Sequence, residues 1–357
     1  MRKEDGLYCY VCTRDPGVAA EARRSGLSPA GRAGDREILY AGPRGGQELA
    51  LSVVNDQADY DVAALIRRAA TGLEGGDHDS IVSVASPLDD GFACLADFYA
   101  IGTHYRFMDE DTFACGDDLF LVAALAGADL SRESLYEYLF FLSPTGDRTW
   151  FDGVRRLLPG QGLRYNALEH GVAVTGPVRV ADRLARLPAT SLDESVRRFV
   201  ERTARTLGGA RANISISAGS DSRTVLAILR ATGAPIHAWS FGSPGLVETD
   251  LIERLVRRFG LEWTLVDMSA FASAWVDRFR RTLRATGGLL NPYRTHYEEF
   301  YDRMPDGEPV FEGVLGSQFL KGEMAVGSIV APAHHDVATG RMTVADAVER
   351  HVADLPE

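Results

Sequence analysis

Hydrophobic and polar positions follow different patterns in the two halves of the chain. In the first half, β-branched and aromatic runs between Gly, Asp and Pro clusters predict strands at residues 48 to 55 and 80 to 85, and a hairpin or two strands at 92 to 108. The alternating segment LYCYVCT, residues 7 to 13, predicts another strand. Apolar residues at helical spacing predict helices at residues 59 to 73, 117 to 127 and 131 to 142.

The end of this first half has a mixed pattern. Residues 143 to 166, SPTGDRTWFDGVRRLLPGQGLRYN, predict a turn, a short helix and a Pro-Gly turn that leads into a strand. Several strands with few helices between them are typical of an α+β domain. We therefore expect an α+β N-terminal domain with packed antiparallel sheets.

The pattern changes near residues 181 to 191, ADRLARLPATS. Ser191 can cap a helix, and Glu194 three residues later completes a capping box. A helix at residues 192 to 207 follows. We place the domain boundary here, between a first domain at residues 1–186 and a second at 187–357.

Strands and helices alternate beyond the boundary. The strand NISIS at 213 to 217 precedes a helix from about Ser222, and the strand PIHAWSF at 235 to 241 precedes a helix at 247 to 259. A further strand, EWTLVD, occupies 262 to 267. Such alternation predicts right-handed βαβ units and an α/β domain with a parallel sheet covered on both faces.

Composition is compatible with two such domains. The chain has 357 residues, 45% of them hydrophobic and 25% charged, which is enough for two cores. It has no apolar run long enough for a membrane span and no signal peptide pattern at its N-terminus, so we expect a soluble cytoplasmic protein without a membrane partner. A net charge of -12 argues against nucleic acid as a partner.

The cysteines favour a structural role. Cys9 and Cys12 form a CxxC pair, but no second pair at zinc-site spacing accompanies them. Strand alternation places the two thiols on opposite faces, so we expect buried or half-buried thiols with neither metal nor disulfide.

Residues 217 to 222, SAGSDS, follow the first strand of the second domain and lead into a helix. Helix N-termini at the carboxyl edge of a parallel sheet attract anions. Small residues allow close approach of a phosphate, the hydroxyls of Ser217 and Ser222 can donate to it, and Asp221 is placed to hold Mg²⁺. The alternative is an ordinary strand-to-helix turn in which Asp221 only caps the helix.

This loop resembles the SGGxDS signature of the PP-loop ATP pyrophosphatases, and SAGSDSRTVLA resembles the version in asparagine synthetase-like proteins. The resemblance implies that ATP is cleaved between its α- and β-phosphates, leaving an acyl-adenylate. Ala218 stands where the family usually has glycine. The residues implied in binding ATP are Ser217, Ala218, Gly219, Ser220, Asp221 and Ser222, with Asp221 as the metal ligand and a catalytic residue.

Two later segments extend the resemblance. Ser240, Phe241 and Gly242 end the second strand, where the family contacts adenine and ribose, and Glu248 occupies a position often acidic in relatives or is a favourable charge in a helix first turn. The segment GVLGSQFLKG, residues 313 to 322, resembles a degenerate copy of GEGSDELFGG. It adds Gly316 and Ser317 to the implied nucleotide site, with Ser317 in place of an acidic residue that helps bind Mg²⁺ and pyrophosphate. Lys321 is a candidate catalytic cation, one of two lysines in the chain.

From about residue 90 onward, the first domain contains in order the segments FACLADFYAIGTHYRF, FACGDDLFLVAAL and TWFDGVRRLLPGQGLRYN. They resemble the latter part of the glutaminase-like domain of asparagine synthetases. A working glutaminase of that type needs a cysteine after the removed Met, and this sequence has Arg2. We therefore expect no glutamine hydrolysis, as in the related β-lactam synthetases and lasso-peptide cyclases. The family also continues further past the second motif, so the second domain is expected to be short at its C-terminus, where Thr343 caps one amphipathic helix.

The resulting hypothesis is an ATP- and Mg²⁺-dependent, AMP-forming ligase that joins a small-molecule carboxylate to an amine or ammonia, alone, as a homodimer or with a partner protein. The alternative is a catalytically impaired nucleotide-binding homologue that acts as a partner or regulator. His296 is a further candidate for the site or an exposed helix residue. His334 and His335 are expected in a solvated loop rather than at a metal.

Overall fold

The protein is described by a computed structural model that covers residues 8–42, 49–54, 81–97, 103–177, 190–269, 275–289, 295–304 and 308–313, with Thr343 and Asp346. The chain divides into two compact units. The N-terminal unit comprises Arg2–Leu187 and Leu283–Leu289, and the C-terminal unit comprises Pro188–Thr282 and Leu290–Glu357. The predicted boundary after residue 186 lies outside the described residues and stays a prediction.

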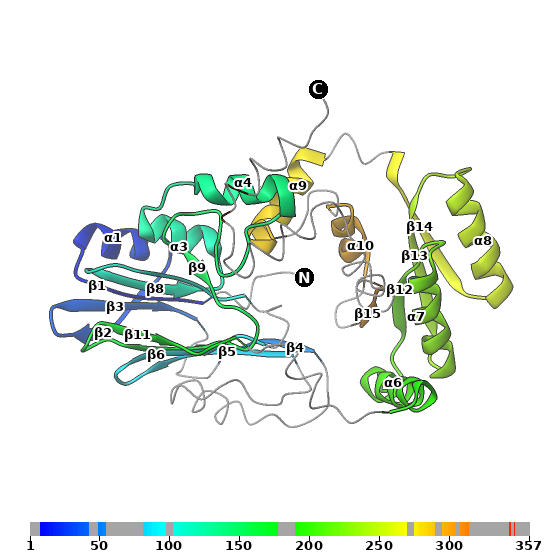
Figure 1. Cartoon of the computed structure of the whole chain (residues 1–357), viewed down its shortest axis with the longest axis horizontal. Coiled ribbons are helices and arrows are strands. Elements are labelled where there is room, and N and C mark those ends of the chain that lie inside the picture. The colour runs from blue at the N-terminus through cyan, green and yellow to red at the C-terminus, as the bar shows by residue number, and fades with distance from the viewer. Residues whose placement is uncertain are drawn as a thin grey trace. The chain divides into compact units, whose positions relative to one another are not determined.

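The N-terminal unit contains two antiparallel sheets (Figure 1). The first has the order β2-β3-β1-β8-β7-β9 and the second the order β11-β10-β6-β5-β4. The strands of the first are β1 (Cys9–Thr13), β2 (Ser28–Ala33), β3 (Arg36–Ala41), β7 (Tyr105–Met108), β8 (Thr112–Gly116) and β9 (Arg155–Arg156). Those of the second are β4 (Leu49–Val54), β5 (Ile81–Leu88), β6 (Gly91–Leu95), β10 (Gly162–Asn166) and β11 (Gly171–Val174).

Two apolar layers hold this unit together. Side chains from both sheets, among them Tyr10, Phe92 and Tyr165, form the layer between the sheets. The opposite face of the first sheet packs against α1 (Pro16–Arg24) and α3 (Leu119–Ala126), and α4 (Arg132–Phe141) follows α3 in the chain. Cys12 belongs to the first layer and Cys9 to the second, which confirms that the two thiols are buried on opposite faces.

Most N-terminal elements are confirmed. Strands appear in the predicted segments 48 to 55 and 80 to 85, and helices in 117 to 127 and 131 to 142. The long run at 92 to 108 forms two strands, but β6 and β7 belong to different sheets, so the hairpin alternative is wrong. The predicted helix at 59 to 73 lies outside the described residues.

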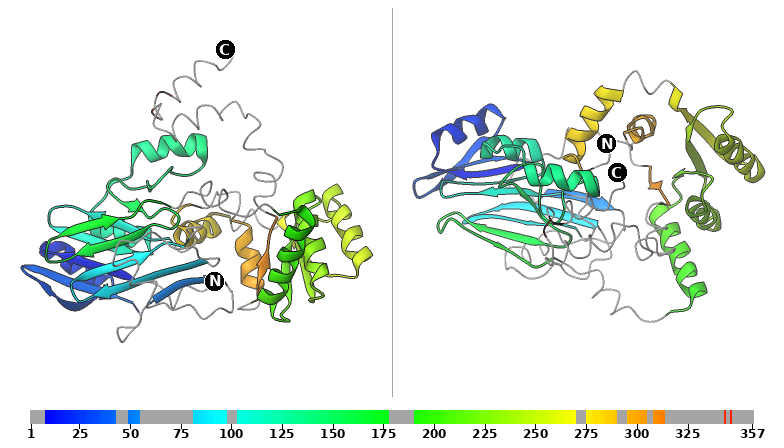
Figure 2. Two further views of the ribbon diagram at one scale, coloured as in Figure 1. Left: turned by 60° about the horizontal axis from the view of Figure 1, so that its bottom comes forward. Right: turned by 45° about the horizontal axis from the view of Figure 1, so that its top comes forward.

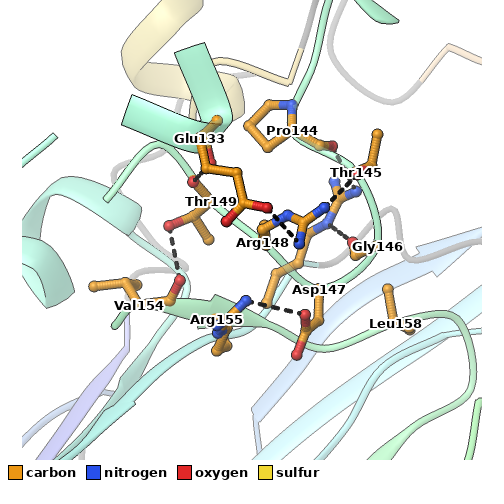
Figure 3. Close-up of polar contacts among 12 residues, drawn as sticks. Glu133, Pro144, Thr145, Gly146, Asp147, Arg148, Thr149, Val154, Arg155 and Leu158 are labelled. Atoms are coloured by element: carbon orange, nitrogen blue, oxygen red, sulfur yellow. Dashed lines mark hydrogen bonds and ion pairs between the residues drawn. The ribbon is translucent and has the colours of Figure 1, made fainter. Parts of the chain in front are cut away.

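The short helix predicted within residues 143 to 166 is also wrong. This stretch contains turns and the two-residue strand β9, because Gly153 has φ +75° and a few residues cannot repay the cost of starting a helix. Polar contacts order the loop instead (Figure 3). Arg148 pairs with Glu133 at 3.4 Å, Arg155 pairs with Asp147 at 3.4 Å, and the Thr149 hydroxyl donates to the Val154 carbonyl at 2.9 Å.

The C-terminal unit is built on a parallel sheet of order β14-β13-β12-β15. The helices α7 and α8 lie on one side of this sheet and α10 on the other (Figures 1 and 2). Buried residues of α6, α7 and α8 form one apolar cluster with the sheet, and Phe300 of α10 forms another with Trp239 and Val266. Within the described residues, no helix has the length and apolar character that crossing a membrane requires. The elements are α6 (Leu192–Leu207), β12 (Ala212–Ser215), α7 (Ser220–Ala231), β13 (Ile236–Gly242), α8 (Val247–Phe259), β14 (Glu262–Asp267), α10 (Tyr297–Arg303) and β15 (Val310–Phe311). The helix α9 (Trp275–Thr286) belongs to this unit as far as Thr282.

The fold class is therefore confirmed: an α+β part with antiparallel sheets precedes an α/β part with a parallel sheet. The predicted bounds of α6, α8 and β14 agree with the structure, whereas α7 begins two residues earlier than predicted. Ser191 caps α6 by accepting from the Glu194 amide at 3.2 Å, but the Glu194 carboxylate binds Arg197 and Arg198 instead of completing the capping box.

Candidate functional site at the carboxyl edge of the parallel sheet

The candidate site is the turn between β12 and α7. The strand ends at Ser215, and Gly219 is the N-cap of a helix that begins at Ser220. Gly219 has no side chain, so the N-cap residue makes no side-chain hydrogen bond to the helix. In the N-terminal unit, by contrast, Asp or Ser caps α1, α3 and α4. An uncapped N-terminus at the carboxyl edge of a parallel sheet is a favourable place for an anion.

Two hydroxyl groups fix the shape of this turn. The Ser222 hydroxyl accepts from the Ser217 amide at 3.1 Å and donates to the Ser217 carbonyl at 3.0 Å. The Ser217 hydroxyl lies 3.1 Å from it and accepts from the Gly219 amide at 3.2 Å. Ser222 is buried whereas Ser217 is exposed. Ser222 therefore braces the turn from inside, and Ser217 is the hydroxyl that faces solvent.

Ala218 is accommodated without backbone strain. Within the described chain, the non-glycine residues with positive φ are Leu142 and His170, so Ala218 has a conformation open to any L-residue. The glycine that is usual in the resembled signature is thus not required here for its conformational freedom.

Two charged side chains near the turn were not assigned a site role from the sequence. The Ala218 amide donates to the Glu248 carboxylate at 3.2 Å, and the Arg223 guanidinium donates to the Gly219 carbonyl at 3.1 Å. The acidic position of Glu248 was a signal, but nothing in the sequence showed that it reaches the turn. Arg223 was detectable only as a basic residue one turn into the helix.

Asp221 occupies the first turn of α7 and accepts from the Ser220 hydroxyl at 3.3 Å. Among the described residues, no three His, Cys, Asp or Glu side chains gather where they can share a metal ion. A cage made only of protein ligands is therefore not found there. Mg²⁺ that arrives with a nucleotide needs one or two carboxylates in addition to phosphate oxygens, and Asp221 fits that requirement.

The second strand places its predicted site residues differently from one another. The Ser240 side chain is fully buried, and its hydroxyl accepts from the Trp263 indole at 2.8 Å. This side chain therefore forms a hydrogen bond within the sheet. Phe241 is half-buried, with its ring centre 4.6 Å from that of His296. Gly242 lies so close to Thr249 that an added Cβ would be 2.8 Å from its hydroxyl.

The third strand contributes an acidic residue that the sequence reasoning did not single out. Asp267 ends β14 and accepts from the Ser269 amide and hydroxyl, each at 2.9 Å. These hydrogen bonds lower the pKa of the Asp267 carboxyl. Its position at the end of a predicted parallel strand was the available signal.

Gly313, the first residue of the second predicted motif, packs against the turn. Gly313 lies two residues beyond β15, and a Cβ added to it would be 2.7 Å from the Ser222 nitrogen and 2.8 Å from the Asp221 carbonyl carbon. The start of this segment therefore packs against the backbone of the turn. Gly316, Ser317, Lys321, His334 and His335 lie outside the described residues, as does Arg2.

Comparisons with protein-family models and with curated proteins each found no match. Among solved structures, the chain is similar to an NH3-dependent NAD synthetase from Campylobacter jejuni, with 12% identity and a TM-score of 0.25 over 47% of this chain and 99% of that one. It is also similar to the allosteric regulatory enzyme of purine biosynthesis, with 10% identity and a TM-score of 0.21 over 88% of this chain. The chain spans 61% of that second protein. These likenesses are too weak for an inference about function.

Proposed function

We propose that the chain is an ATP-dependent, AMP-forming ligase that joins a carboxylate to an amine. The observation that carries this proposal is the turn from Ser217 to Ser222, which combines an uncapped helix N-terminus with small residues at the carboxyl edge of a parallel sheet. Its sequence, SAGSDS, resembles a signature associated with cleavage of ATP at the α-phosphate.

The proposed reaction has two steps. A carboxylate oxygen of the acyl substrate attacks the α-phosphorus of ATP, and the bond from that phosphorus to the bridging oxygen breaks, so pyrophosphate leaves. An amine or ammonia then attacks the acyl carbon, loses a proton and displaces AMP. The N-terminal end of α7 and the Ser217 hydroxyl hold the pyrophosphate, with Asp221 as ligand to the metal. Mg²⁺, when bound, neutralises charge on the departing pyrophosphate.

Exchange of labelled pyrophosphate into ATP tests this function, because exchange requires a reversible adenylation step. The protein would be incubated with Mg²⁺ and a panel of carboxylic acids. We expect exchange with at least one acid. Asp221→Asn should reduce the exchange rate by at least tenfold, because the metal loses a charged ligand. Asp250→Asn, which removes an exposed carboxylate from α8, is the matched control.

The second candidate function is nucleotide binding without turnover. The feature that favours it is Ser317, which stands where the resembled motif has an acidic residue. ATP binding measured by calorimetry, with no pyrophosphate exchange for any acid, would support this candidate over the ligase. Absence of ATP binding by the folded protein would contradict both.

A further inference from the structure

Glu248 forms a contact that is unusual for an anion-binding turn. Its carboxylate accepts a hydrogen bond from the Ala218 amide at 3.2 Å. A phosphate held by this turn needs the same kind of donor. The acidic side chain thus lies where an incoming anion meets both an occupied amide and a like charge.

The position of Glu248 is set by the first turn of α8. The Thr249 hydroxyl donates to the Ser243 carbonyl at 3.0 Å. Gly242 packs against the same hydroxyl so closely that a Cβ added to it would be 2.8 Å away. These contacts fix the residues that lead into α8 (Val247–Phe259). Glu248 is therefore presented to the turn by packed backbone, while its side chain is exposed and can move.

Glu248 forms no ion pair with any cation in the part of the chain that the structure describes. Its partner in the described part of the chain is the Ala218 amide, whereas Glu253 on the same helix pairs with Arg257 and Glu262 on β14 pairs with Arg211. A metal-free polyphosphate at this turn would thus meet the Glu248 carboxylate as well as the Arg223 guanidinium, which donates to the Gly219 carbonyl. A polyphosphate that carries Mg²⁺ would bring the missing positive charge, to which the carboxylate can turn.

We propose that Glu248 is the specificity-determining residue by which this turn discriminates against metal-free nucleotide: its carboxylate occupies the Ala218 amide and is displaced by phosphate that carries Mg²⁺. This inference rests on the proposed nucleotide site. It adds how that site distinguishes nucleotide that carries Mg²⁺ from nucleotide that does not. Glu248 competes with phosphate for the Ala218 amide, and its negative charge repels phosphate that carries no metal.

Binding of ATP by calorimetry, with Mg²⁺ or with EDTA, tests the inference. Without metal, Glu248→Gln should bind ATP about threefold to tenfold more tightly than the unmodified protein, because the repulsion is removed. With Mg²⁺ the two should differ by less than about twofold. Asp250→Asn removes the same charge from an exposed residue two positions along α8, and should change metal-free binding by less than about twofold.

Hydrogen exchange provides a readout that does not require any ligand. Glu248→Ala removes the acceptor of the Ala218 amide, so the peptide that contains residues 217 to 222 should exchange faster than in the unmodified protein and in Asp250→Asn. Circular dichroism checks that each variant is folded. Equal metal-free affinities for Glu248→Gln and Asp250→Asn would overturn the role of Glu248 and leave the ATP site intact. Failure of every folded protein to bind ATP would instead overturn the proposed function.

Discussion

At the scale of single residues, His104 is a buried histidine whose hydrogen bonds determine its tautomer. Its Nε2 lies 3.0 Å from the Leu95 carbonyl, which can only accept, so Nε2 carries the proton. Nδ1 must then accept from the Tyr8 hydroxyl at 2.6 Å. Burial lowers the pKa of His104 to about 4, against the opposing effect of the Leu95 carbonyl.

This low pKa predicts acid sensitivity. Below the ordinary histidine pKa of about 6.5 the unfolded chain binds a proton that folded His104 does not, so stability is full above about pH 6.5 and falls as the pH approaches 4. The loss is roughly 3 kcal/mol in unfolding free energy for this residue. Denaturant unfolding of the N-terminal unit between pH 7 and pH 4 measures it. His104→Gln should flatten the curve. A curve parallel to that of the unmodified protein would contradict the assignment.

At the scale of elements, the end of β15 and the start of α7 approach each other through a glycine. A Cβ on Gly313 would be 2.7 Å from the Ser222 nitrogen and 2.8 Å from the Asp221 carbonyl carbon. Backbone atoms cannot move aside as the end of a flexible side chain can. The turn itself must therefore shift to accept any larger residue at this position.

Gly313→Ala should consequently weaken ATP binding as well as stability. We expect a loss of about 1–3 kcal/mol in unfolding free energy and a reduced ATP affinity, because the displaced backbone belongs to the candidate site. Calorimetry and thermal unfolding measure the two effects. Gly176→Ala is the control, since an added Cβ there meets nothing within 4 Å. Equal behaviour of both variants would show that the close approach is not maintained in solution.

At the scale of the whole molecule, the chain does not divide cleanly into a first and a second part. Leu283–Leu289, which the sequence assigned to the second domain, belongs to the N-terminal unit. Gly287 and Gly288 have φ of +58° and +71°, and Cβ atoms added to them would collide with Tyr105 and Trp150. Two glycines are therefore needed for this segment to pack within the N-terminal unit.

Gly288→Ala tests the importance of that packing in the full chain. We expect a loss of about 2–4 kcal/mol in the unfolding free energy of the N-terminal unit, from both backbone strain and the collision with Trp150. Gly127→Ala has a similar φ of +58° but open space around its Cβ, so it isolates the cost of the backbone conformation. A loss no larger than that of Gly127→Ala would show that the contact with Trp150 is relieved cheaply.

The sequence by itself determined the elements whose signals are local. The Ser191 cap marked the start of α6, and the strand-to-helix turn at Ser217 was predicted from its small residues. Those signals depend on neighbours within one or two turns of chain, so they survive without knowledge of the fold.

Only the tertiary structure decided which distant residues meet at the candidate site. The contact between Glu248 and Ala218 joins residues 30 positions apart, and Gly313 reaches the same turn from the end of β15, the strand beside β12. Strand order and the packing of α8 create these contacts, and neither leaves a local pattern in the sequence. The position of the turn between a strand and a helix could therefore be predicted from the sequence. The approach of the Glu248 carboxylate and of Gly313 to that turn could not.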